Sequence, residues 1–89
     1  METSIINTNN EIIESAPKEK FYSLQELQEI VEGYIEIVFL PNNFCLVVNE
    51  EGKLKQLPIN IIATQIIRQF GINDIIVGNA LYCNRNQLD

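Results

Sequence analysis

Six side chains of this 89-residue sequence are cationic and could hold an anion, and Lys53 and Lys55 are two of them. Lys53 and Lys55 are separated by one residue, so on an extended segment both side chains would project to the same side. Arg68 could join them from a downstream helix or from a second copy of the chain, because a guanidinium binds phosphate through two parallel hydrogen bonds. The three predict a pocket for one or two phosphate groups, although ordinary surface cations would show the same pattern.

Two tyrosines and one asparagine could complete this pocket. Tyr34 and Tyr82 offer rings on which a base or ribose could stack, although a tyrosine in a strand more often serves packing. Asn60 is expected to cap the helix that follows it and is also a candidate for contact with the ligand. The ligand that these residue types favour is a small nucleotide-like molecule.

Four glutamates form a competing candidate surface. Glu26, Glu29 and Glu32 fall on the solvent side of a predicted helix, and Glu36 follows in the next predicted strand. Such a surface could bind the basic groove of another protein by charge complementarity, although a solvated helix face is the plainer interpretation. The adjacent pair Glu50-Glu51 precedes Gly52 and fits an exposed turn better than acid–base or magnesium chemistry.

Composition argues against several classes of function. The sequence has no histidine, which removes the commonest general base near neutral pH and the commonest zinc ligand, so we expect no enzyme, no metal site and no cofactor. Twelve acidic and six basic residues give a formal charge of −6, which repels nucleic acids and anionic membrane surfaces. Apolar runs are far shorter than the roughly 20 residues of a spanning helix, and no signal-peptide pattern opens the chain. We therefore expect a cytoplasmic protein, with Cys45 and Cys83 as buried, reduced thiols and a disulfide or metal pair as the alternative.

The elements that must position these residues form one domain over residues 1–89. Two isoleucine pairs, Ile5-Ile6 and Ile12-Ile13, flank a run of asparagines and predict a hairpin within residues 1–20, which end in a polar connector. A core over residues 21–83 and a polar tail over residues 84–89 follow.

Two helices are predicted within this core. Ser23 and Glu26 form a capping box at the start of the first, and Gly33 is expected to end it in the left-handed conformation. The second is expected to begin after Asn60 and to end at Gly71, with an apolar face at helical spacing between them.

Strands are predicted from alternating or continuous apolar residues. The expected segments are Tyr34–Leu40, Phe44–Asn49 and briefly Leu54–Leu57. A final strand or pair of strands is expected over residues 75–77 and 80–83, with a kink or bulge near Gly78-Asn79. The resulting fold class is α+β, with a mainly antiparallel sheet of five to six strands and two helices on one face. A sheet covered on one face only leaves apolar side chains exposed, which predicts a homodimer or higher homo-oligomer.

Four sequence blocks occur in a fixed order after Leu24-Gln25-Glu26-Leu27. They are G-Y-I-E at residues 33–36, N-E-E-G-K-L at residues 49–54, L-P-x-N at residues 57–60 and D-I-I-x-G at residues 74–78. In these blocks the chain resembles a family of small proteins of phages, plasmids and other mobile elements that carry a domain of unknown function. Gln56 departs from the family pattern where glycine is common, and Ile61 departs where arginine is frequent.

The resemblance implies a bacterial host cell, in which small acidic proteins of mobile elements often inhibit host defence. One hypothesis is a non-enzymatic anti-defence protein that sequesters a nucleotide-derived immune signal. Its ligand-binding residues would be Tyr34, Lys53, Lys55, Asn60, Arg68 and Tyr82. The alternative is an acidic inhibitor that resembles DNA in charge and binds a host defence nuclease or another nucleic-acid-handling protein. Its interaction face would consist of Glu26, Glu29, Glu32 and Glu36.

Overall fold

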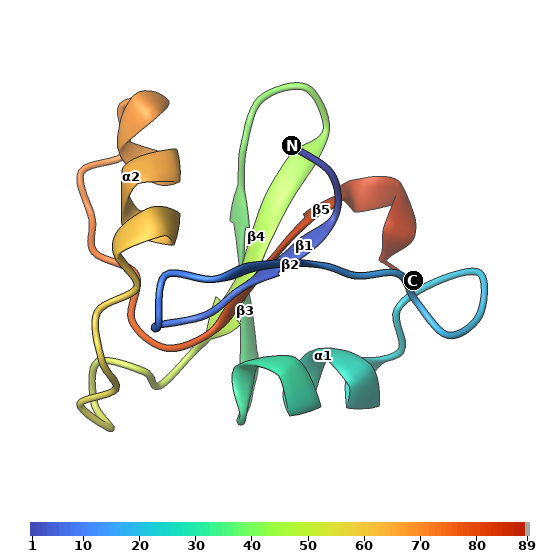
Figure 1. The fold of residues 1–89 in the computed structure, drawn as a ribbon, viewed down its shortest axis with the longest axis horizontal. Helices are drawn as coiled ribbons and strands as arrows, with labels where there is room; N and C mark the ends of the chain where they lie inside the picture. The colour runs from blue at the N-terminus through green and yellow to red at the C-terminus, as the bar shows by residue number, and fades with distance from the viewer. Residues whose placement is uncertain (89) are drawn as a thin grey trace.

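The computed structural model describes residues 1–88 and contains one five-stranded sheet with two α-helices (Figure 1). In chain order the elements are β1 (Ser4–Ile6), β2 (Ile12–Glu14), α1 (Leu24–Val31), β3 (Ile35–Phe39), β4 (Phe44–Asn49), α2 (Ile61–Gln69), β5 (Ala80–Asn84) and the 3₁₀-helix η1 (Arg85–Gln87). The strand order is β2-β1-β5-β4-β3, and all neighbours pair antiparallel. The predicted α+β class and antiparallel sheet are therefore confirmed.

The two helices cover opposite faces of the sheet, which corrects the prediction that both lie on one face (Figure 1). Successive side chains of a strand point to opposite faces, so β4 separates two cores. Leu46 and Val48 pack in one core with Ile67 of α2. Val47 packs in the other with Val31 of α1. Because β4 is apolar on both faces, each face of the central sheet needs its own cover.

Helix α1 begins as the sequence predicts and ends one residue earlier. Ser23 Oγ accepts a hydrogen bond from the backbone N of Glu26 at 3.1 Å, and the Glu26 carboxylate accepts one from the backbone N of Ser23 at 3.1 Å. The left-handed residue at the helix end is Glu32, with a φ of 63°, not Gly33. Gly33 is needed instead for close approach, because a Cβ there would lie 2.6 Å from Nδ2 of Asn49.

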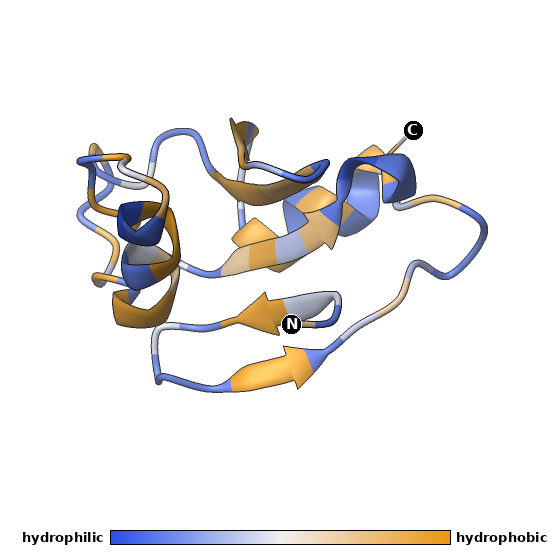
Figure 2. Ribbon diagram, turned by 90° about the horizontal axis from the view of Figure 1, so that it is seen from above, coloured by the Kyte–Doolittle hydropathy of each residue, from blue (hydrophilic) through white to orange (hydrophobic). Residues whose placement is uncertain are grey.

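The N-terminal hairpin forms one edge of the sheet. Strands β1 and β2 pair with Ile5 opposite Ile13, and both strands are hydrophobic while their connecting turn is hydrophilic (Figure 2). Asn10 takes a positive φ of 65° in the turn, as asparagine does more readily than most residues. Ile12 and Ile13 of the edge strand are each about half exposed.

Residues 50–56, which follow β4, form turns, so the strand predicted over Leu54–Leu57 is wrong. The backbone N of Lys55 donates to the carbonyl oxygen of Glu51 at 2.9 Å, and that of Gln56 donates to the carbonyl oxygen of Lys53 at 3.1 Å. These local bonds curl the chain. Lys53 and Lys55 therefore do not lie on the extended segment that the sequence suggested.

The last strand is shorter than predicted and begins at Ala80. Ile75 lies in the loop before it, and Val77 makes an isolated antiparallel bridge with Ile59 outside the sheet. Gly78, with a φ of 78°, provides the kink between the bridge and β5, as its position in the sequence predicts.

The segment predicted as a polar tail is folded onto the domain up to the last described residue. Asn84 belongs to β5, and η1 follows it directly. The backbone N of Tyr22 donates to the carbonyl oxygen of Gln87 at 2.8 Å, which fastens η1 beside the start of α1. The remaining residue of the predicted tail, Asp89, lies outside the described residues.

Candidate functional site

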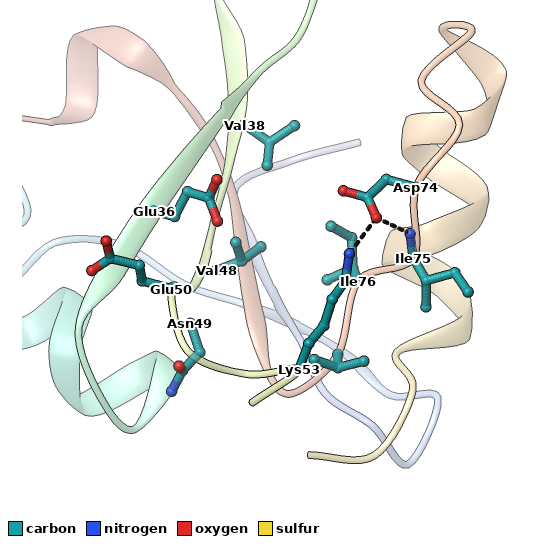
Figure 3. A pocket seen from close by; sticks show the side chains of 10 residues that line it. Glu36, Val38, Val48, Asn49, Glu50, Lys53, Asp74, Ile75 and Ile76 are labelled. Carbon is teal, nitrogen blue, oxygen red and sulfur yellow. Dashed lines mark hydrogen bonds and ion pairs between the residues drawn. The ribbon is translucent and has the colours of Figure 1, made fainter. Parts of the chain in front are cut away.

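A hollow that combines apolar and charged side chains lies between β3 and the loop that precedes β5 (Figure 3). Its volume is about 200 Å³. It is lined by Glu36, Val38, Val48, Asn49, Glu50, Lys53, Asp74, Ile75, Ile76 and Val77. We call it the carboxylate hollow, because three of its four charged side chains are acids.

One wall of the carboxylate hollow comes from β3 and β4. Glu36 and Val48 are direct partners in the sheet register, so both side chains point to the α2 face. Val38 follows Glu36 on the same face by strand alternation. The Glu36 carboxylate reaches into the space between the walls, whereas that of Glu50 points away from it (Figure 3). Two valines and one carboxylate thus share this wall.

The opposite wall carries an ion pair. Lys53 Nζ donates to Asp74 Oδ1, and the same oxygen accepts from the backbone N of Ile75 at 2.7 Å. The hydrogen bond from Lys53 is the main cause that lowers the pKa of Asp74, and the bond from Ile75 adds to it. The positive charge of Lys53 is therefore balanced by the carboxylate of Asp74. Glu36 has no ion-pair partner in the part of the chain that the structure describes.

The three cations of the predicted phosphate pocket lie apart. Lys53 lines the carboxylate hollow, whereas Lys55 pairs with Glu51 at 3.8 Å. Arg68 lines a separate hollow of about 310 Å³ beside the exposed side chains of Ile59 and Ile61. Neither hollow includes Lys55, so a single copy of the chain does not assemble the pocket from these residues.

The two candidate tyrosines also occupy different surroundings. Tyr34 is 63% exposed just before β3 and lines neither of these hollows. Tyr82 lies on β5, where its ring stacks on Phe44 with centroids 5.2 Å apart and an interplanar angle of 14°. Burial raises the pKa of Tyr82. This ring serves packing on the α2 face, the plainer of the two interpretations that the sequence allowed.

Asn60 caps α2 as predicted, while its contact with a ligand stays a prediction. The side chain is completely buried. Its Oδ1 accepts from the backbone N of Ala63 at 3.0 Å, and its Nδ2 donates to the carbonyl oxygens of Ile6 and Gly78 at 2.8 and 2.9 Å. Both amide hydrogens are used, so no donor remains for a ligand.

The predicted acidic face is divided between the two sides of the sheet. Glu26 and Glu29 lie along α1 and line a hollow of about 330 Å³ with Glu19. Hydrogen bonds from the backbone N of Ser23 and, secondly, of Lys18 lower the pKa of Glu26, so this carboxylate has a structural role.

The other two members of that face lie elsewhere. Glu32 directly follows α1 as its C-cap, and Glu36 points to the opposite face of the sheet, in the carboxylate hollow. The sequence suggested Glu36 as a site residue but did not suggest the ion pair on the opposite wall. Asp74 lies 21 residues from Lys53, and no local spacing indicates that the two side chains pair.

The described residues contain neither a cluster of metal-ligating side chains nor a membrane-spanning helix. Within residues 1–88, no three His, Cys, Asp or Glu side chains gather so as to hold a metal ion. In the same range, no helix has both the length and the apolar character required to cross a membrane.

Comparison with known proteins identifies a family. No curated protein and no solved structure matches the chain. The family model described as a domain of unknown function, DUF3846, matches residues 3–88, which include every helix and strand that the structure describes. The chain therefore belongs to the family defined by this domain of unknown function, DUF3846.

Proposed function

We propose that this chain is a non-enzymatic binding protein that uses its acidic surface to hold a basic surface of a partner protein. The observation that carries the proposal is the carboxylate hollow. There Glu36 faces an open, partly apolar space and has no ion-pair partner among residues 1–88, while Lys53, which lines the same hollow, is paired with Asp74. A carboxylate left free beside apolar surface favours a cation supplied from outside.

An arginine or lysine side chain of a partner suits this hollow. The aliphatic stem of such a side chain could pack on Val38 and Val48, while the charged head reaches Glu36. Arginine would gain more than lysine, because a guanidinium donates two parallel hydrogen bonds to one carboxylate. The hollow thus supplies one specific contact within a wider electrostatic attraction.

The wider attraction comes from the net charge of the chain. A formal charge of −6 on 89 residues accelerates encounter with a basic surface and repels nucleic acid. In the mobile-element setting that the sequence resemblance implies, the partner would be a host defence nuclease or another nucleic-acid-handling protein. The chain would then occupy the groove in which that protein holds DNA or RNA, as an anti-defence inhibitor.

The alternative hypothesis, sequestration of a nucleotide-derived signal, stays a prediction with less support. Its two lysines are paired with Asp74 and Glu51, and the hollow beside Lys53 would place phosphate near Glu36. Such a ligand would have to displace an ion pair or bind between copies of the chain.

The proposal is tested by capture with two charge-reversed variants. Glu36→Lys alters the carboxylate hollow on edge strand β3, and Glu14→Lys makes the same charge change on the opposite edge strand, β2. Immobilised wild type and Glu14→Lys should retain a basic protein from bacterial lysate at low salt and release it as salt rises. Glu36→Lys should fail to retain it. Equal retention by all three, or retention of nucleotides alone, would contradict the proposal.

A defined probe tests the hollow without knowledge of the partner. Titration of the ¹⁵N-labelled chain with N-acetyl-arginine amide should shift the backbone amide signals of Val48, Lys53 and Ile75 in wild type. The same titration of Glu36→Gln should leave these signals in place. N-acetyl-glutamine amide, which has no charge, serves as the control ligand and should shift none of them.

A further inference from the structure

Cys45 and Cys83 face each other inside the sheet. They are direct partners in the register of β4 and β5, and their sulfur atoms lie 3.7 Å apart. Both side chains are completely buried, and neither thiol is in a disulfide. The proposed binding surface uses neither of them, because they lie on the α1 face of the sheet.

The backbone at this position has the spacing that a disulfide requires. Arg85 donates from its backbone N to the carbonyl oxygen of Asn43 at 2.8 Å, which makes these two residues a hydrogen-bonded pair of the ladder. Such pairs alternate along antiparallel strands, so Cys45 and Cys83 are again a hydrogen-bonded pair. Their Cα atoms are then about 5.5 Å apart, within the usual disulfide range of about 4.4–6.8 Å.

The apolar packing around the two thiols limits which oxidants can reach them. The thiols lie in an apolar cluster beneath α1 that also contains Tyr22, Leu27, Val31, Val47 and Leu81. A peptide disulfide such as oxidised glutathione is too large and too polar for this space. Hydrogen peroxide is small and uncharged, so it can reach the thiols during brief local opening of the packing.

The pKa values of the two thiols are shifted in opposite directions. The hydrogen bond with Cys83 is the main cause that lowers the pKa of Cys45, with a smaller contribution from the charge of Arg85. The same hydrogen bond and burial raise the pKa of Cys83. The thiolate is the form that attacks peroxide, so we expect Cys45 to react first.

We propose that Cys45 and Cys83 form a peroxide-sensitive dithiol site that closes to an intrachain disulfide. The Cys45 thiolate attacks one peroxide oxygen, the O–O bond breaks, and a sulfenic acid forms while hydroxide leaves and becomes water. The Cys83 sulfur then attacks the sulfenic sulfur, the S–O bond breaks, and the second water leaves with the thiol proton. Peroxide is reduced to two waters and two thiols are oxidised to one disulfide.

The bond would covalently join β4 and β5, two adjacent strands that contribute side chains to both cores. The two cysteines are 38 positions apart in the chain, so the bond would close a covalent loop. This loop includes α2 and residues 74–77, which form one wall of the carboxylate hollow. Because cross-linking restricts the unfolded chain more than the folded one, the oxidised protein is expected to unfold at a higher urea concentration.

The test is intact mass spectrometry of the folded protein after treatment with hydrogen peroxide, with thiols then blocked by alkylation in denaturant. The expected product has lost two hydrogens, takes up no alkyl group, yields a Cys45–Cys83 cross-linked peptide, and reverts with dithiothreitol. Met1 is the sole methionine and is exposed, so its gain of one oxygen verifies that the peroxide was active.

Other products would overturn the proposal. They are two free thiols in a protein whose Met1 is oxidised, oxygen added to a cysteine without a cross-link, or a disulfide between two chains. Cys83→Ala adds a second readout, since without Cys83 the product at Cys45 should carry added oxygen and form no intrachain cross-link. If this variant does not fold, the products of the wild-type protein still decide the question.

Discussion

The side-chain amide of Asn60 donates a hydrogen bond to the carbonyl oxygen of Ile6, 54 residues earlier in the chain, at 2.8 Å. The same amide nitrogen donates to Gly78 at 2.9 Å, and the amide oxygen caps α2 through Ala63. One buried side chain therefore ties the start of α2 to the end of β1 and to the kink before β5. Loss of these bonds would leave buried backbone groups without partners.

Asn60→Ala is expected to destabilise the fold by roughly 3 kcal/mol, the sum of a lost cap and of unsatisfied buried carbonyl groups. Urea unfolding followed by circular dichroism measures the change. Ser23→Ala is the matched control, because it removes the cap of α1 at an exposed position and should cost about 1 kcal/mol. Equal losses in the two variants would show that the bonds to Ile6 and Gly78 contribute little.

Local patterns predict the parts of this fold that local chemistry determines. Ser23 with Glu26, Asn60 before an apolar helical stripe, and the Ile5-Ile6 and Ile12-Ile13 pairs around asparagines each specify an element from adjacent residues. The placement of helices relative to the sheet is not local. It follows from the apolar character of both faces of β4, which requires cover on two sides.

The candidate site is harder to predict for the same reason. The sequence predicts Glu36 as an acidic surface residue, but its charged neighbours in the hollow come from the loops around Lys53 and Asp74. Lys53 and Lys55 were expected on one extended segment, whereas turns that depend on bonds such as Lys55 to Glu51 separate them. Spacing rules apply only within a regular element, and this segment is not one.

Gly33→Ala is expected to destabilise the fold by about 1–3 kcal/mol through its effect on Asn49. The new methyl group would lie 2.6 Å from Nδ2 of Asn49, which donates to the carbonyl oxygen of Val31 at 3.0 Å, so that buried bond must break or lengthen. Urea midpoints of the single variants and of the double variant with Asn49→Ala form a cycle. Gly33→Ala should lower the free energy of unfolding much less in the Asn49→Ala background than in wild type. An equal loss in both backgrounds would show that the effect arises from the backbone at residue 33 and not from Asn49.

The ion pair of Lys53 and Asp74 is expected to make stability depend on pH. The pKa of Asp74 is lowered in the folded chain from an ordinary value of 3.8, so its contribution is present above that value. It is lost as pH falls below 3.8 towards the folded pKa. Asp74→Asn should therefore lower the urea midpoint at pH 6 and match wild type more closely near pH 2.5, with Glu14→Gln as a control. An equal difference at both pH values would contradict this origin.

Arg85→Ala is expected to destabilise the fold by about 1 kcal/mol, because Arg85 fastens η1 to the edge of the sheet. Its guanidinium donates from Nη2 to the carbonyl oxygen of Leu40 at 3.1 Å and lies 4.5 Å from the ring centre of Phe39. Arg85→Lys should recover only part of this loss, since an ammonium lacks the planar guanidinium that donates to the carbonyl group while it stacks on the ring.

Arg68→Ala removes the same charge from the exposed side of α2, where we expect a change within about 0.5 kcal/mol. Urea unfolding of the three variants separates the contact from the charge: equal effects of Arg85→Ala and Arg68→Ala would assign the loss to net charge alone.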